Sequence, residues 1–298
     1  MAEPNTVVPR FVAAAHEDPA WVRLALITFT LVVMGVLIVV PLVNVFYQAF
    51  AGGFAVYWNN LVADQDTRHS IYLTLIVAPT AVAANVVFGV AAAWAIARFR
   101  FPGRTLLTAF IDLPFAVSPV VVGLFLMLIF GLQGFLGPWL RAHDIKIVFA
   151  VPGLVLATSF VTFPVVAREL IPVMEAIGAD EEIAAVSLGA RGWQMFSRVT
   201  LPNIKWGLLY GVILCNARAM GEFGAVAVVS GRISGQTDTM PLRVEKLFQE
   251  YNLPGAFAVA SVLASLAVVT LLLKTGLEWK TRSDLAATAR EAEGGGRA

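Results

Sequence analysis

The stretch DEEIAAVSLGARGWQMFSRVTLPNIKWG, Asp180 to Gly207, is polar and helix-prone in a chain whose other long stretches are apolar. A helix is expected to begin at its acidic residues, Asp180, Glu181 and Glu182, because negative charge is stabilised in the first turn of a helix. Asp180 can act as the cap, and Gly189 is the natural left-handed stop. The pattern predicts a short helix that ends near Leu188.

A second short helix is predicted after this glycine. Trp193, Phe196 and Val199 recur at a three-residue spacing, which makes one apolar face. Pro202 is well placed to begin the helix that follows, because proline is tolerated in the first turn. Two short amphipathic helices joined at a glycine form a knob, and its apolar face suits a partner groove or the membrane surface.

The composition indicates a protein of the lipid bilayer. Of the 298 residues, 58% are hydrophobic and 14% are charged, whereas soluble domains carry roughly 25% charged residues. The mean hydropathy is +0.78. A formal net charge of +1 gives no indication of a nucleic-acid partner.

Apolar stretches of the length that a bilayer-spanning helix needs, about 20 residues, occur six times. They lie at about residues 24–46, 71–97, 106–130, 147–167, 207–229 and 256–274. We therefore predict an all-α integral membrane protein with about six transmembrane helices, which places both termini on one side of the membrane.

The basic residues predict the orientation. They are concentrated in the N-terminal segment, in residues 98–104, in the loop 168–206 and after Lys274. Because basic residues favour the cytoplasmic side, both termini and that loop are expected in the cytoplasm. The expected division is a cytoplasmic segment 1–22, a transmembrane domain 23–280 and a cytoplasmic tail 281–298, which its polar, glycine-rich composition predicts to be disordered.

The loop resembles a known signature. AAVSLGARGWQMFSRVTLP is similar to the EAA signature of ABC-importer permeases, which implies the type I ABC importer permease fold. In that family the loop is the coupling helix that docks into a cleft on the ATPase subunit. The glutamate that usually precedes the alanines is replaced by Ile183, with Glu182 one position earlier, so the acidic residue that serves this role is left open. The coupling residues that the resemblance implies are Asp180, Glu181, Glu182, Ala184, Ala185, Gly189, Ala190, Trp193, Phe196, Leu201 and Pro202.

A second stretch narrows the resemblance. NIKWGLLYGVILCNARAMGEFGAVAVVSGRISGQTDTMPL, Asn203 to Leu242, resembles sulfate/thiosulfate permeases of the CysW type. Molybdate permeases share its Ala-Arg-Ala-x-Gly-Glu-Phe-Gly core, so a molybdate, tungstate or other oxyanion permease is the alternative. The flanking residues Asn203 to Gly207 and the pair Cys215-Asn216 favour the CysW type. The resemblance covers roughly residues 22–280.

The resemblance implies partners as well as a fold. The chain would be a multi-pass permease subunit of the bacterial cytoplasmic (inner) membrane, working with CysA-like ATP-binding subunits that use ATP and Mg²⁺. A homologous CysT-like permease, or a second copy of this chain, would share the translocation path, and a periplasmic sulfate/thiosulfate-binding protein would deliver the anion. No cofactor is expected in this chain, because it has no Gly-x-x-x-x-Gly-Lys-Ser/Thr loop.

Charged residues inside the predicted spans have two interpretations. Arg218 and Glu222 lie four residues apart on one helical face, and the pair either fixes helix packing or adds positive potential to an oxyanion path. Asn216 could hydrogen-bond between helices or line that path. Asp112 is expected to pair with a basic residue near the cytoplasmic mouth. Prolines inside the spans, Pro119 among them, suit helix breaks that line a cavity.

Two other classes of protein are weighed against this reading. An ion-coupled secondary transporter would work without an ATPase, tolerate loss of the loop and show inverted repeats of hydropathy. A membrane-embedded enzyme would need a catalytic constellation, and neither His-Glu-x-x-His nor Gly-x-Ser-x-Gly occurs. The sequence therefore predicts a transport subunit rather than an enzyme.

Overall fold

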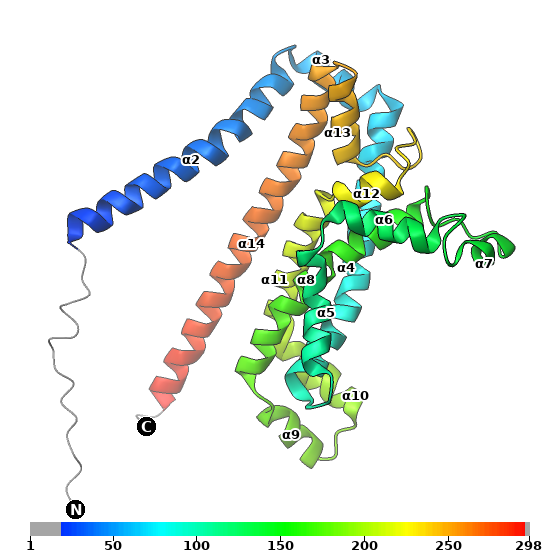
Figure 1. The fold of residues 1–298 in the computed structure, drawn as a ribbon. Helices are drawn as coiled ribbons and strands as arrows, with labels where there is room; N and C mark the ends of the chain where they lie inside the picture. Colours follow the sequence, from blue (N-terminus) through cyan, green and yellow to red (C-terminus); the bar gives the residue numbers. More distant parts are fainter. Residues whose placement is uncertain (1–18, 296–298) are drawn as a thin grey trace, which may run out of the picture. The chain divides into compact units, whose positions relative to one another are not determined.

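The chain, studied as a computed structural model, is described over residues 19–295, with the side chains of Ala20 and of residues 280–295 outside the description. Within these limits every regular element is a helix (Figure 1). The elements are α2 (Ala20–Phe50), α3 (Phe54–Val62), α4 (Gln65–Arg98), α5 (Arg104–Ala116), α6 (Pro119–Phe130), α7 (Gly137–Ala142), α8 (Val151–Ile177), α9 (Asp180–Ser187), α10 (Gly192–Met195), the π-helix η1 (Phe196–Thr200), α11 (Leu201–Met220), α12 (Gly224–Val229), α13 (Met240–Gln249) and α14 (Leu253–Gly295).

The chain divides into two units, residues 1–48 and 49–298. The described part of the first unit is almost entirely the helix α2, which is apolar on all of its faces, as is typical of a helix in lipid. Of the predicted N-terminal segment 1–22, residues 1–18 lie outside the description.

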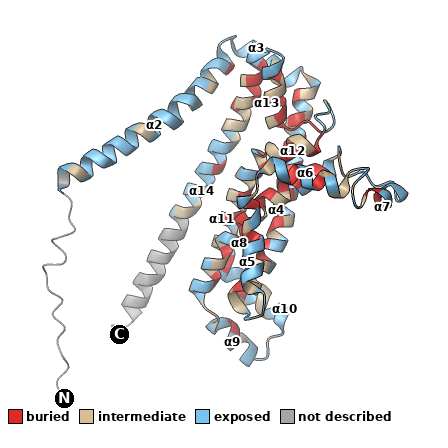
Figure 2. Ribbon diagram, in the orientation of Figure 1, coloured by how far each residue is buried: buried red, intermediate tan, exposed pale blue. Residues whose placement is uncertain are grey.

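In the second unit α8 is the central helix. It packs along α4 and α11, and α5 covers another part of it. Val166, Leu170 and Met174 of α8 are fully buried in this core (Figure 2). Gly89 lets α4 and α8 approach each other closely, because a Cβ at this position would lie 2.8 Å from the Cγ1 of Val166.

The predicted number of six spans is not reproduced. Among the described residues four helices are long and apolar enough to cross a membrane, at Trp21–Phe50, Gln65–Arg98, Val151–Ile177 and Leu253–Trp279, and a bent pair, α5 with α6, makes a fifth if counted as one span. The stretch predicted at 207–229 is divided between α11 and α12. Its polar and charged residues explain why, since Lys205, Asn216 and Arg218 lower the hydropathy of α11 and the buried Glu222 lies at the break.

The predicted third span is broken as well. The axes of α5 and α6 differ by 110°. The break comes at Ser118, whose φ of −60° and ψ of 134° are extended rather than helical. Pro119 explains this conformation, because a proline disfavours the helical region for the residue before it and then begins the next helix well.

The two ends of the second unit differ in character. The loop of α9 and α10 lies at one end, and α3 and α13 lie at the other (Figure 1). At that other end α13 packs against α14 and α4. The helical backbone of α14 continues to Gly295, and residues 296–298 lie outside the description.

Candidate functional site

The loop that joins α8 to α11 has the predicted two-helix form. The helix α8 ends before Gly178, whose φ is 74°, and α9 ends before Gly189, whose φ is 89°. Only glycine adopts such backbone angles without strain. The predicted cap is wrong, because Ala179 occupies the cap position without a side-chain hydrogen bond and Asp180 is the first helical residue. Asp180 instead stabilises α9 through its negative charge in the first turn, where it interacts favourably with the helix dipole.

No loop separates the second short helix from the next span. The helix α10 passes through the π-turn η1 directly into α11, with Leu201 and Pro202 as its exposed first two residues. The amide of Arg191 donates to the Oε1 of Gln194 (2.9 Å), which supports the start of α10. The turns from Gly192 to Met220 thus form one continuous helical rod.

Glu182 fastens the loop to the transmembrane helices. Its Oε2 accepts from the Nε of Arg98 at the end of α4 (2.9 Å), and its Oε1 accepts from the hydroxyl of Thr200 (2.8 Å). Arg98 also donates to the carbonyl of Met174 in α8 (2.7 Å). Both members of the ion pair are nearly buried. Glu182 therefore connects α9 to α4, α8 and the end of the π-turn, whereas Ile183, the residue directly before the alanines, is exposed.

A second acidic residue makes a shorter connection on the surface. The Oε2 of Glu181 accepts from the Nδ2 of Asn203 in α11 (2.5 Å). The first helix of the loop, α9, is thereby bonded to α11, into which the second helix of the loop continues.

The tip of the loop is apolar and exposed. Leu188 is 90% exposed and Trp193 is 75% exposed, and they lie on the two sides of the glycine elbow. Figure 2 draws the turn between α9 and α10 as exposed. The rings of Trp193 and Phe196 stack with centroids 5.8 Å apart, as a shared apolar face requires, and Phe196 also packs against Trp94 of α4 with centroids 5.4 Å apart. Of the other predicted coupling residues, Ala184 is exposed and Ala185 and Ala190 are half-buried.

The charged residues at the end of α11 are brought together. The Nη1 of Arg218 donates to the Oε2 of Glu222 (2.7 Å), and the other carboxylate oxygen accepts from the amide of Ala225 (3.1 Å). The Glu222 side chain is 2% exposed, and that of Arg218 is 43% exposed. Asn216 is half-buried and is bonded to neither of them in the described structure. Glu222 is thus fixed, and it positions a guanidinium that faces away from the core.

Comparison with known proteins places the chain in a family. A family model for the "Binding-protein-dependent transport system inner membrane component" matches residues 85–283. The chain is 52% identical over 260 residues to the sulfate transport system permease protein CysW of Escherichia coli (strain K12), covering 87% of this chain and 89% of that protein. It belongs to the CysW family of transport permeases. A related permease, CysT of the same organism, is 38% identical over 235 residues, with 79% of this chain and 84% of that protein covered.

The CysW-family chain also has a known fold. It superposes on a chain of the bacterial alginate ABC transporter, solved in complex with an alginate pentasaccharide-bound periplasmic protein, with a TM-score of 0.71 at 17% identity, covering 88% of this chain and 95% of that one. The predicted ABC permease fold is therefore confirmed. The chain is a multi-pass inner-membrane transport component rather than an enzyme.

Two ion pairs of the CysW-family chain join α5 to α8. The Nε of Arg168 lies 2.7 Å from the Oδ1 of Asp112, and the Nη2 of Arg104 lies 2.9 Å from the Oε1 of Glu175. A basic partner was expected for Asp112, and the structure identifies it as Arg168. The sequence held no signal for this choice, because the pairing depends on how α5 lies against α8.

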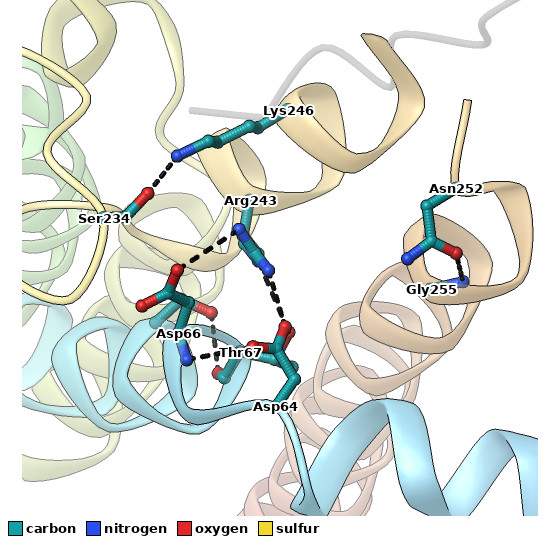
Figure 3. Close-up of polar contacts among 9 residues, drawn as sticks. Asp64, Asp66, Thr67, Ser234, Arg243, Lys246, Asn252 and Gly255 are labelled. Carbon is teal, nitrogen blue, oxygen red and sulfur yellow. Dashed lines mark hydrogen bonds and ion pairs between the residues drawn. The ribbon is translucent and has the colours of Figure 1, made fainter. Parts of the chain in front are cut away.

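A further polar cluster was missed at the end that carries α13. The buried side chain of Arg243 bonds the Oδ2 of Asp64 (2.5 Å) and lies 3.9 Å from the Oδ2 of Asp66, and Thr67 donates to Asp64 (2.6 Å) (Figure 3). Burial alone would raise the pKa of Asp64, but the hydrogen bonds from Thr67 and Arg243 and the charge of Arg243 hold that pKa below its usual value. The sequence signal was available in part, since the extended Asp64 that precedes α4 is a typical cap residue.

Asp238 adds an unsatisfied group to the same end. It is 1% exposed, and neither carboxylate oxygen has a hydrogen-bond partner among the described residues. Burial raises the pKa of Asp238, and the nearby positive charges of Lys246 and Arg243 only partly oppose this effect. Lys246 itself is hydrogen-bonded to Ser234 (Figure 3). The structure thus buries a carboxyl group without a hydrogen-bond partner among the described residues, and the charges of Lys246 and Arg243 do not fully offset the cost of its burial.

Proposed function

We propose that this chain is the membrane-spanning permease of an ATP-driven importer of sulfate or thiosulfate, and that the loop from Asp180 to Pro202 couples it to a separate ATPase. The observation that carries the proposal is the exposed apolar tip of Leu188 and Trp193, held on a base that the buried Glu182 fixes. Exposed apolar side chains on a rigid helical support are suited to a groove on a partner protein.

The substrate rests on the relatives. A protein named as a sulfate permease shares 52% of aligned residues with this chain over nearly its whole length. A molybdate, tungstate or other oxyanion permease is the alternative within the same class, because the Ala-Arg-Ala-x-Gly-Glu-Phe-Gly core is common to both groups in the resemblance described above. In either case the chain moves its substrate without changing it chemically. The energy comes from hydrolysis of ATP, which the partner subunits bind together with Mg²⁺.

The expected assembly has four kinds of partner. A CysT-like permease, or a second copy of this chain, forms the path together with it, and CysA-like ATPases bind below the membrane. A periplasmic binding protein delivers the anion at the end that carries α13, and the lipid bilayer surrounds the spans. This arrangement places both termini and the loop in the cytoplasm, as the distribution of basic residues favours.

The loop has two physical connections through which closure of the ATPases would reach the path. One is the continuous rod of α10, η1 and α11, which leads from Trp193 to Arg218. The other is the ion pair of Glu182 with Arg98, which leads into α4. A displacement of the tip therefore moves two core helices together and alternately opens the two sides of the path.

The test compares two exposed apolar residues at opposite ends of the second unit. Leu188→Glu is expected to abolish co-purification of the candidate ATPase and the ATP hydrolysis that a sulfate-loaded binding protein stimulates. Phe248→Glu, on the exposed face of α13, is the matched control and should leave ATPase binding intact. If the wild-type chain transports sulfate without an ATPase, or if Leu188→Glu binds and couples normally, the secondary-transporter alternative replaces this proposal.

A further inference from the structure

Arg168 is an exposed charged residue in a largely buried part of α8. Between residues 157 and 171 of α8 it is the one residue that is exposed. Its side chain is 56% exposed, and that of its partner Asp112 on α5 is 38% exposed. An ion pair that both helices could have enclosed is therefore presented on the surface of this chain.

The pair lies within a candidate membrane span. Arg168 comes nine residues before Ile177, at which α8 ends, or about 14 Å along the axis at 1.5 Å per residue. A charged side chain in the hydrocarbon costs about 2.5–3.5 kcal/mol on the insertion scale, so such groups face protein or water. The break between α5 and α6 follows Asp112 along the chain, and broken helices at membrane depth line cavities or are buried in protein.

The guanidinium of Arg168 uses only some of its hydrogen-bond donors. Its Nε donates to Asp112, and its Cζ lies 5.1 Å from the centroid of the Phe115 ring, which supports one face of the plane. A guanidinium has five N–H donors in a planar fork that matches the spacing of oxyanion oxygens, and among the described residues Asp112 is the one acceptor bonded to it. The free donors of this exposed guanidinium are suited to a second, negatively charged acceptor.

Two more enclosed ion pairs of the chain differ in this respect. Glu222 uses both of its oxygens and is 2% exposed, and the Arg98–Glu182 pair is almost enclosed. Asp112 accepts through one oxygen, in the open. Of the three pairs, Arg168–Asp112 is the one whose anionic member can be exchanged for another anion at low cost.

We propose that Arg168 binds the transported oxyanion in the inner half of the path, and that Asp112 is the counter-ion that this anion displaces and that afterwards expels it. The inference rests on the proposed function and deepens it, because it names a binding residue for a tetrahedral dianion such as sulfate. Repulsion between the dianion and Asp112 keeps binding weak, and a transport site requires binding weak enough to permit release.

The test uses complexes assembled with the ATPase, the partner permease and the binding protein in liposomes. Arg168→Gln should still assemble but reduce sulfate uptake by about tenfold or more, the value of a charge-assisted hydrogen bond. Asp112→Asn frees the guanidinium and should lower the half-saturating sulfate concentration on the inner side while slowing turnover. Arg104→Gln, which breaks the exposed pair with Glu175 between the same two helices, is the control and should keep uptake within about twofold, as expected for a surface ion pair.

A labelling measurement covers the case in which charge removal disturbs folding. Phe115→Cys, beside the intact guanidinium of Arg168, should react with a charged thiol reagent from the inner side, and sulfate should slow the reaction, whereas wild type supplies the background through its buried Cys215. Equal losses in Arg168→Gln and Asp112→Asn, recovered by exchanging the two residues, would identify a structural ion pair and overturn the inference. So would a cysteine that no reagent reaches. Failure of the wild-type chain to bind an ATPase is a separate outcome, which overturns the proposed function itself.

Discussion

Arg98 and Glu182 form an ion pair of 2.9 Å across the junction between α4 and α9, with 9% and 11% of their side chains exposed. The carboxylate is also bonded by Thr200 and the guanidinium by the carbonyl of Met174. A buried charge that loses its partner is strongly destabilising. This pair therefore helps to fix the angle between the loop and the membrane helices, together with the bond between Glu181 and Asn203.

Removal of one member of this pair is expected to be costly. Glu182→Gln leaves Arg98 buried without a counter-charge, and losses of this kind are about 3 to 5 kcal/mol. Thermal unfolding in detergent should show the loss, and ATPase co-purification should fall with it. Glu175→Gln is the control at an exposed pair, where at most about 1 kcal/mol is expected. Equal effects of the two variants would contradict the importance given to Glu182.

The elbow of the loop can be tested without adding bulk. A Cβ at Gly189 would meet nothing within 4 Å, so Gly189→Ala acts through the φ of 89° alone and should cost roughly 1 to 2 kcal/mol. Gly192→Ala also enters open space, at the start of α10 and without a positive φ, so it should be neutral or slightly stabilising. ATPase binding by the purified complex should weaken in the first variant only. A loss in Gly192→Ala would point to direct contact with the partner instead of backbone geometry.

Asp238 is expected to be more tolerant of replacement than its burial suggests. Its oxygens have no hydrogen-bond partner among the described residues, and its pKa is raised by burial, so the ionised form is less favourable in the folded state than in the unfolded chain. The stability that this preference contributes is complete below the unfolded pKa and is lost as pH rises through the folded pKa. Asp238→Asn, which is always neutral, should therefore raise the melting temperature at pH 7 relative to wild type. A lower melting temperature would show that the carboxylate is ionised and bonded.

The Asp64–Arg243 pair has the opposite dependence on pH. Because the pKa of Asp64 is lowered in the folded state, its contribution to stability is present above the unfolded pKa and is lost as pH falls through the folded value. Melting temperatures measured between pH 6 and about pH 3 should fall less steeply in Asp64→Asn than in wild type. Arg243→Gln should flatten the same range, since it removes the cation that lowers the pKa. Parallel curves for all three proteins would contradict the role of this pair.

Local rules predicted the loop better than the spans. The turn at Gly189 and the two short helices followed from glycine, acidic residues and spacing, which act within a few residues. The division of 207–229 did not follow, because Glu222 is accommodated by the amide of Ala225 and the guanidinium of Arg218, and these bonds form only once the helix has ended. The contact of Phe196 with Trp94 and the pairing of Asp112 with Arg168 were equally hidden, since each depends on a helix distant in sequence.

The π-turn at Phe196–Thr200 would allow the loop to rotate once the bonds of Glu182 and Glu181 are released. Its five residues wind more loosely than an α-helix, so they hold one extra residue in the turn. Tightening them to α-helical winding would rotate everything before them by about 100° around the axis of α11. Trp193 would then face another direction while the membrane helix stayed in place. The direction in which the two-helix loop faces therefore depends on the number of residues per turn in the backbone between α10 and α11.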